Sequence, residues 1–161
     1  MINKFLLNFF LMVVYVALSG EVTFLSMLAG FIIGLLIVTL LGQATGRGGY
    51  LRRVWGALRF GIYFIYILVK ANLGVAKEIL TPGFSMSPRI IRYSVAGLSD
   101  VETTTLANAI TLTPGTLSAD ISDDGDKLYI HCMYAEIRDD ALAELDELKA
   151  WMLREVFDHE L

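Results

Sequence analysis

The sequence is poor in the residues that most often carry out chemistry. It contains a single cysteine, Cys132, and two histidines among 161 residues, so it can form no internal disulfide and no zinc site built from several cysteines. It has no Walker-type phosphate loop, no HExxH pattern and no GxSxG pattern. We therefore expect no catalytic residues, no cofactor and no metal. Cys132 lies within a predicted strand, where a small buried hydrophobic role is expected.

Charge is scarce in the first half of the chain and unbalanced overall. Residues 1–81 contain seven Lys/Arg and two Asp/Glu, a net charge of +5, whereas residues 82–161 contain six Lys/Arg and fifteen Asp/Glu, a net charge of −9. Hydrophobic residues make up 55% of the chain and the mean hydropathy is +0.59, values typical of a membrane protein. We expect a membrane region over 1–81 and an acidic soluble domain over 82–161, with the lipid bilayer but no nucleic acid among the partners.

Two apolar runs open the sequence. Residues 5–18 contain one Asn and no charge, and residues 22–41 contain no charge at all, which is long enough to cross a bilayer. The first run could alternatively be a secretory signal, because Ala17-Leu18-Ser19 resembles a cleavage site. A chain that already carries a membrane span does not need a secretory signal, so we interpret 4–19 and 22–42 as a transmembrane hairpin.

Small and basic residues add detail to this hairpin. Gly30 and Gly34 form a small-xxx-small pair, which favours close helix contact within the hairpin or with a partner. Arg47, Arg52 and Arg53 follow the second span closely, and the positive-inside rule then places this loop in the cytoplasm.

Residues 52–80 contain no proline and are predicted to form one long amphipathic helix. At 100° per residue, its cations Arg52, Arg59, Lys70 and Lys77 fall within about 20° of each other, opposite an apolar face. This basic stripe suits a helix in the cytoplasmic interface or a third span that turns the stripe toward partner subunits or water. We favour the interface. Lys70 would then contact phosphates or a partner, rather than act as a proton relay.

The second half of the chain predicts a small α/β domain. Its order is βαββα, with strands at 89–95, 115–121 and 127–133 and helices at about 99–112 and 138–158. Alternation places the following residues inward: Ile91, Tyr93 and Val95; Leu117, Ala119 and Ile121; Leu128, Ile130 and Cys132. The buried stripe of the last helix is expected to be Ala141, Leu145, Leu148, Met152 and Val156. The first two strands should be parallel and joined by a right-handed crossover, with both helices on one face of a three-stranded sheet.

Two polar segments of this domain need interpretation. Asn108, Thr111, Thr113, Pro114, Gly115 and Thr116 cluster at the turn from helix to strand. They could cap backbone groups locally or form a docking surface for partner subunits. The segment 120–125 superficially resembles a calcium loop, but its required twelfth position falls on His131 and strands flank it, so we interpret it as a hairpin turn.

The stretch LANAITLTPGTL, Leu106 to Leu117, continues through SADISDD and KLYIH to His131. It resembles the E subunit of the Mrp-type multisubunit sodium/proton antiporter. The resemblance covers nearly the whole chain, including the apolar start LLNFFLMVVYVALSGE and the central VKANLGVAKEILTP.

This resemblance implies an accessory, non-catalytic subunit of the cell membrane that supports assembly and activity. Its partners would be the other antiporter subunits, including the large antiporter-like ones that translocate ions. The predicted spans agree, because neither contains a carboxylate. The alternative is a free-standing membrane-anchored sensor or enzyme with a cytoplasmic domain.

Overall fold

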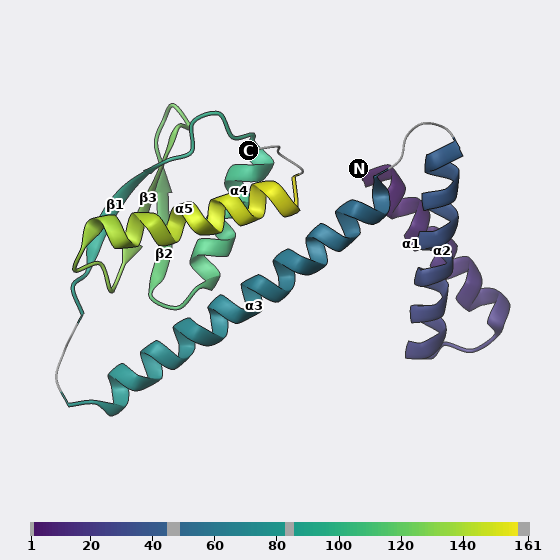
Figure 1. Cartoon of the computed structure of the whole chain (residues 1–161), viewed down its shortest axis with the longest axis horizontal. Helices are drawn as coiled ribbons and strands as arrows, with labels where there is room; N and C mark the ends of the chain where they lie inside the picture. The colour runs from purple at the N-terminus through teal and green to yellow at the C-terminus, as the bar shows by residue number, and fades with distance from the viewer. Residues whose placement is uncertain (1, 45–48, 83–85, 158–161) are drawn as a thin grey trace. The chain divides into compact units, whose positions relative to one another are not determined.

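The structure, a computed structural model, describes residues 2–44, 49–82 and 86–157. Its elements are α1 (Ile2–Ser19), α2 (Phe24–Ala44), α3 (Tyr50–Leu80), β1 (Arg89–Ser94), α4 (Asp100–Leu112), β2 (Thr116–Ile121), β3 (Lys127–Cys132) and α5 (Arg138–Glu155), drawn in Figure 1. They pack into two compact units, residues 1–55 and 56–161. The predicted boundary at 81/82 divides the chain by environment rather than by packing, and it stays a prediction.

The first unit is the helical hairpin of α1 and α2. Gly30 and Gly34 are buried on α2, where a methyl group at Gly30 would lie 3.1 Å from the Tyr15 ring and one at Gly34 would overlap the Asn8 side chain. The glycine pair therefore brings α2 close to α1, so the contact is made within the hairpin.

Asn8 is a polar residue at the centre of this contact. Its side chain is completely buried, and its Nδ2 donates to the Tyr50 hydroxyl at 3.0 Å. Burying an amide is costly unless it is hydrogen-bonded, so this bond ties α1 to the first residue of α3. Its Oδ1 has no hydrogen-bond partner in the described part of the chain.

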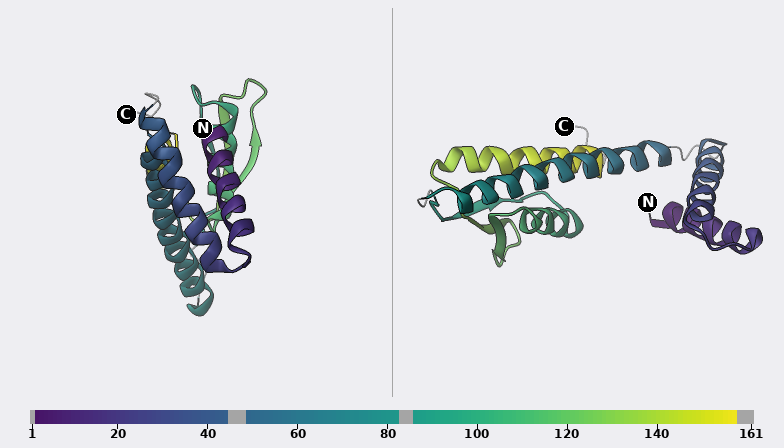
Figure 2. Two further views of the ribbon diagram at one scale, coloured as in Figure 1. Left: turned by 90° about the vertical axis from the view of Figure 1, so that its right-hand side faces the viewer. Right: turned by 90° about the horizontal axis from the view of Figure 1, so that it is seen from below.

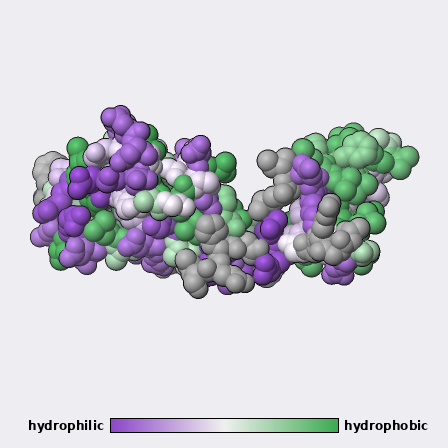
Figure 3. All heavy atoms as spheres, turned by 90° about the horizontal axis from the view of Figure 1, so that it is seen from above, coloured by the Kyte–Doolittle hydropathy of each residue, from purple (hydrophilic) through white to green (hydrophobic). Residues whose placement is uncertain are grey.

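Two of the described helices, α2 and α3, are long and apolar enough to cross a membrane, and α1 is a shorter apolar helix. The surface over α1 and α2 is largely hydrophobic (Figure 3). By contrast, α3 carries five of the seven basic residues found in residues 1–81.

The second unit contains a three-stranded sheet in the order β1-β3-β2. Both strand pairs are antiparallel, with Ile91 opposite Ile130 and Thr116 opposite Cys132. The prediction that the first two strands are parallel holds for their direction, since β1 and β2 are both antiparallel to β3 and so run the same way. They do not pair with each other, because β3 lies between them, next to β2 through the short hairpin.

The predicted inward faces are confirmed for β1 and β3 and are wrong for β2. Leu117 is 47% exposed and lies opposite His131, outside the core. The inward position Ser118 instead donates to the carbonyl of Ala107 at 3.1 Å, and the register shifts between Ser118 and Asp120. The inward positions of β2 thus carry hydroxyl groups instead of apolar side chains, because these hydroxyls donate hydrogen bonds to carbonyl groups of α4.

The N-terminus of α4 agrees with its sequence signal. Ser99 caps α4, and a complete capping box joins it to Glu102. In α5, Leu145, Leu148 and Met152 are buried as predicted, and Leu153 joins them in place of Val156.

The core lies between the inner face of the sheet, α4 and α5, and α3 packs against it as a third helix. Phe60, Tyr63, Phe64 and Ile67 of α3 contact this core. The Tyr63 ring stacks on Trp151 of α5, with ring centroids 4.6 Å apart, and the two helices run alongside each other (Figure 2). A methyl group at Gly56 would overlap the backbone of Glu155, so this glycine allows the close approach.

Candidate functional site: a cavity beside α3

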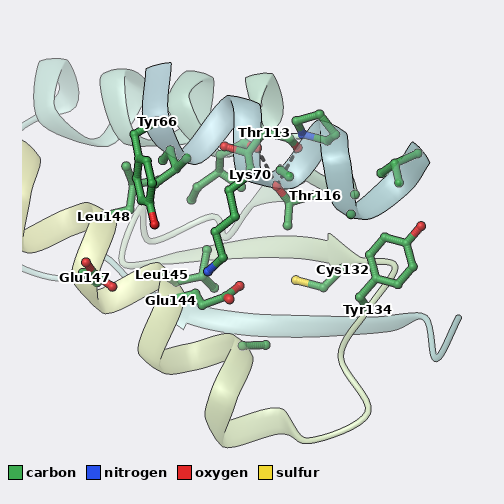
Figure 4. A pocket seen from close by; sticks show the side chains of 18 of the residues that line it. Tyr66, Lys70, Thr113, Thr116, Cys132, Tyr134, Glu144, Leu145, Glu147 and Leu148 are labelled. Carbon is green, nitrogen blue, oxygen red and sulfur yellow. Dashed lines mark hydrogen bonds between the residues drawn. The ribbon is translucent and has the colours of Figure 1, made fainter. Parts of the chain in front are cut away.

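A cavity of about 540 Å³ lies within the second unit, where the C-terminal half of α3 stands away from α5. Its walls come from α3, from the turn between α4 and β2, and from α5, with Cys132 and Tyr134 at the far side (Figure 4). Its lining includes Tyr66, Lys70, Glu78, Thr113, Pro114, Gly115, Thr116, Cys132, Tyr134, Glu144 and Glu147. The cavity therefore brings one residue of the basic stripe, Lys70, together with four residues of the predicted docking set, Thr113 to Thr116.

The turn that forms one wall is held by its own hydroxyl groups. Thr113 Oγ1 donates to the carbonyl of Ala109 at 3.1 Å, and Thr116 Oγ1 donates to the carbonyl of Ile110 at 2.6 Å. These carbonyls belong to the last turn of α4, which needs partners outside the helix. The local capping role proposed for this segment is thus observed at Thr113 and Thr116.

Pro114, Gly115 and Tyr134 form the part of this wall that faces the cavity. Gly115 has φ of +90°, a left-handed conformation that glycine adopts at little cost. A side chain there would also meet the Tyr134 ring at 3.1 Å. The wall is therefore apolar and closely fitted, although the sequence around it is rich in hydroxyl groups.

Asn108 and Thr111 do not line the cavity. Both are exposed on α4. Thr111 Oγ1 donates to the carbonyl of Ala107 at 2.9 Å and accepts from the Ser118 amide at 3.2 Å. The predicted docking set is thus divided between a cavity wall and the outer surface of α4.

The basic stripe of α3 is divided in the same way. Arg59 forms an ion pair with Glu155 of α5 at 3.6 Å, and Lys70 extends into the cavity toward Glu144 (Figure 4). Arg52 belongs to the first unit, and Lys77 is exposed outside the cavity lining. In the second unit, the stripe therefore faces acidic residues of α5.

The carboxylates of the cavity were not identified from the sequence. Glu144 and Glu147 are three residues apart, a spacing that places both on one side of a helix, but only the packing of α3 shows which side matters. Glu144 also acts on Cys132. Burial raises the pKa of the Cys132 thiol, and the negative charge of Glu144 raises it further, so the thiol stays protonated and unreactive near neutral pH.

A second polar contact joins the sheet to α5 away from the cavity. The Tyr93 hydroxyl donates to Asp146 Oδ1 at 2.6 Å, and burial, followed by this bond, raises the tyrosine pKa.

His131 lies on the outer face of β3, between Ile90 and Leu117 in the register. In the described part of the chain, no group of three or more His, Cys, Asp or Glu side chains is arranged to hold a metal.

Comparisons with known proteins identify the family. Residues 8–154 match the model of the family described as Na+/H+ ion antiporter subunit, MNHE. The chain is 34% identical to the E subunit of a Na(+)/H(+) antiporter from Alkalihalophilus pseudofirmus, over 81% of this chain and 82% of that protein. It is 33% identical to the E1 subunit of a Na(+)/H(+) antiporter from Staphylococcus haemolyticus, over 95% and 96%.

A solved structure agrees with this assignment. A chain in the structure of the Mrp complex from Dietzia sp. DQ12-45-1b is 30% identical, with a TM-score of 0.50, over 62% of this chain and 94% of that one. The resemblance found in the motif from Leu106 to His131 is thus confirmed over most of the sequence. The chain belongs to the MNHE family of Na+/H+ antiporter subunits.

Proposed function

We propose that this chain is the E subunit of a multisubunit Na+/H+ antiporter, and that its role in the membrane complex is accessory and non-catalytic. The observation that carries the proposal is family membership over residues 8–154, joined to a hairpin without transport chemistry. Between Lys4 and Arg47 the only charged residue is Glu21, in the short link between α1 and α2. Because no charged residue lies within the helices between Lys4 and Arg47, the hairpin offers no proton relay across the bilayer, so ion translocation belongs to the partner subunits.

We infer that α3 lies in the membrane interface rather than across the bilayer. Its face away from the domain core is an exposed apolar stripe of Leu58, Ile62, Ile65, Val69 and Leu73. Its opposite face packs against the soluble core and stands beside the acidic residues of α5. A spanning α3 would take these carboxylates into the hydrocarbon or lose the packing, and charged groups there are costly. A helix in the interface can place its exposed apolar stripe in the lipid and keep its opposite face packed against the soluble core.

The same arrangement supports a cytoplasmic soluble domain. Arg47, Arg52 and Arg53 follow α2 closely in the sequence and favour the cytoplasmic side, and an α3 that does not cross leaves the domain on that side. Lys70 then supports position rather than transport, because it faces α5 within the same unit. Asn108 and Thr111 remain the exposed candidates for a docking surface on α4.

Isolation of the complex tests this function. The tagged full chain, extracted from its own membranes in mild detergent, should bring several very hydrophobic partner subunits with it. Deleting its gene should abolish assembled complex and cation-driven proton movement in vesicles. Purification of the chain alone, with antiport unaffected by the deletion, would favour the free-standing sensor or enzyme instead.

The orientation is tested by labelling. Ala96 is exposed in the link between β1 and α4, so Ala96→Cys in a Cys132→Ala background provides one accessible thiol. A membrane-impermeant reagent should label it in inverted vesicles but not in intact cells. Labelling of intact cells would place the domain outside and require α3 to cross the membrane.

A further inference from the structure

The cavity beside α3 has an unbalanced charge. Two carboxylates of α5, Glu144 and Glu147, line it, and one cation of α3, Lys70, lies opposite them. Glu144 and Glu147 stand on the same side of α5, and like charges at this spacing destabilise a helix. Lys70 extends toward Glu144 (Figure 4) and can balance only one charge. A second cation would stabilise the arrangement.

Many of the other lining residues are apolar. Ile67, Val75, Ile110, Leu145 and Leu148 contribute side chains, and the fitted wall of Pro114, Gly115 and Tyr134 adds more. A volume of about 540 Å³ holds several side chains, well beyond a single hydrated ion. The site therefore suits an occupant that is mainly apolar and carries a positive charge.

The position of the cavity follows from how α3 is attached. The N-terminal half of the helix is held tightly at Gly56, which has no room for a methyl group, and at Tyr63, which stacks on Trp151. Beyond Tyr66 the helix leaves α5, and the cavity follows it to Glu78. The fold thus forms a groove between α3, the turn from α4 to β2, and α5, and the carboxylates of Glu144 and Glu147 are exposed at its rim.

We propose that this groove is the docking site for a segment of a partner subunit that presents a Lys or Arg flanked by apolar side chains. The cation would lie between Glu144 and Glu147, and the apolar side chains would fill the space between α3 and the Thr113–Thr116 turn. The inference rests on the proposed function, because it requires a complex with partner subunits. It adds the chemistry of the partner segment. The segment would be recognised by its charge and shape, and not by the hydroxyl groups of Thr113 and Thr116.

Photo-crosslinking in the assembled complex tests the proposal directly. A photoreactive phenylalanine derivative replaces Ala71, which lines the groove, or Leu73, which is 66% exposed on the other side of α3. From position 71 we expect one crosslinked partner segment containing Lys or Arg among apolar residues. From position 73 we expect lipid. Crosslinking of lipid alone, or of an acidic segment, from position 71 would overturn the proposal.

Charge reversal provides the second test. Glu147→Lys should lower the amount of co-purified partner about three- to tenfold, because a charge pair at a rim contributes modestly but its reversal also repels. Asp140→Lys is the matched control, since Asp140 is exposed on the same helix outside the groove. Thermal unfolding of the purified variant chains separates a loss of docking from a loss of fold.

A compensating change completes the design. Replacing the crosslinked cation of the partner with Glu should restore recovery in the Glu147→Lys background. If Glu147→Lys and Asp140→Lys lowered the recovery of partner subunits equally, in a complex that otherwise assembles, the groove would be rejected as the docking site. The proposed subunit function would not be contradicted. Absence of partner subunits around the unaltered chain would instead reject the proposed function itself.

Discussion

The helices α2 and α3 both have the length and apolarity of a membrane span, yet they are used differently. α2 carries no charge and buries Gly30, Gly34, Val38 and Gly42, of which the first two lie against α1. α3 carries a basic stripe, and it packs its aromatic residues against a soluble core. The difference teaches that length and hydropathy select candidates, whereas the neighbour of each face decides whether a helix suits the bilayer interior or its surface.

The sharpest test places the same charge on each helix. Ile33 of α2 and Ile65 of α3 are both exposed apolar residues. Ile33→Lys should oppose insertion by about 2.5–3.5 kcal/mol, the cost of a lysine at the centre of a span. Ile65→Lys should cost much less, because an interfacial lysine reaches water.

The readout is external labelling of Glu21→Cys in a Cys132→Ala background, since Glu21 lies between the two hairpin helices. The labelled fraction should fall for Ile33→Lys and stay near that of the parent for Ile65→Lys. Equal losses would mean that α3 is embedded as deeply as α2, and the distinction between the helices would disappear.

A second test concerns the attachment of α3 to its domain. Gly56→Ala would press a methyl group against the backbone of Glu155, which cannot move aside without shifting α5. We expect destabilisation of about 1–3 kcal/mol, the usual cost of overpacking. Gly74→Ala is the control, because its methyl group would meet open space and should stabilise the helix by about 0.5–1 kcal/mol.

Denaturant unfolding of the purified full chain, followed by the near-UV signal of the Trp151 region, measures both variants. Unchanged stability in Gly56→Ala would show that α3 separates readily from α5. The second unit would then lack its third helix, and the cavity would lose a wall.

A smaller effect is expected at the corresponding glycine of α2. Gly34→Ala overlaps the Asn8 side chain, which is flexible and can give way, at the loss of its hydrogen bond to Tyr50. We expect a cost of about 1–2 kcal/mol for the disturbed buried amide. Gly61→Ala on α3, which meets nothing within 4 Å, should instead stabilise slightly. Detergent-based unfolding of the full chain compares the two, and a neutral Gly34→Ala would argue against tight packing in the hairpin.

The smallest effect is predicted for Lys70. Lys70→Arg keeps the charge beside Glu144 and should leave antiport near normal, whereas Lys70→Ala removes the cation of an exposed charge pair, worth about 0–1 kcal/mol. The measurement is cation-driven proton movement in vesicles, normalised to assembled complex. Because arginine does not release its proton in proteins, loss of transport in Lys70→Arg with assembly intact would place Lys70 on the proton route.

Much of the architecture could be predicted from local signals. The capping box at Ser99, the alternation in β1 and β3, and the Asp124-Gly125 hairpin, whose glycine has φ of +75°, each depend on neighbouring residues. The inward face predicted for β2 was wrong because of the contacts that β2 makes with α4. Leu117 was expected inside because it is apolar, but the inward positions are taken by Thr116 and Ser118, whose hydroxyls donate to carbonyls of α4.

By itself, the sequence determined the charge-free hairpin, the basic stripe of α3 and the order of strands and helices, because these follow from composition and periodicity along the chain. Only the tertiary structure decided that β3 lies between β1 and β2, that α3 joins the soluble core, and that Lys70 meets Glu144 beside the Thr113–Thr116 turn. These contacts bring together residues dozens of positions apart. Their partners are selected by packing and charge in three dimensions, and no local pattern of side chains records that choice.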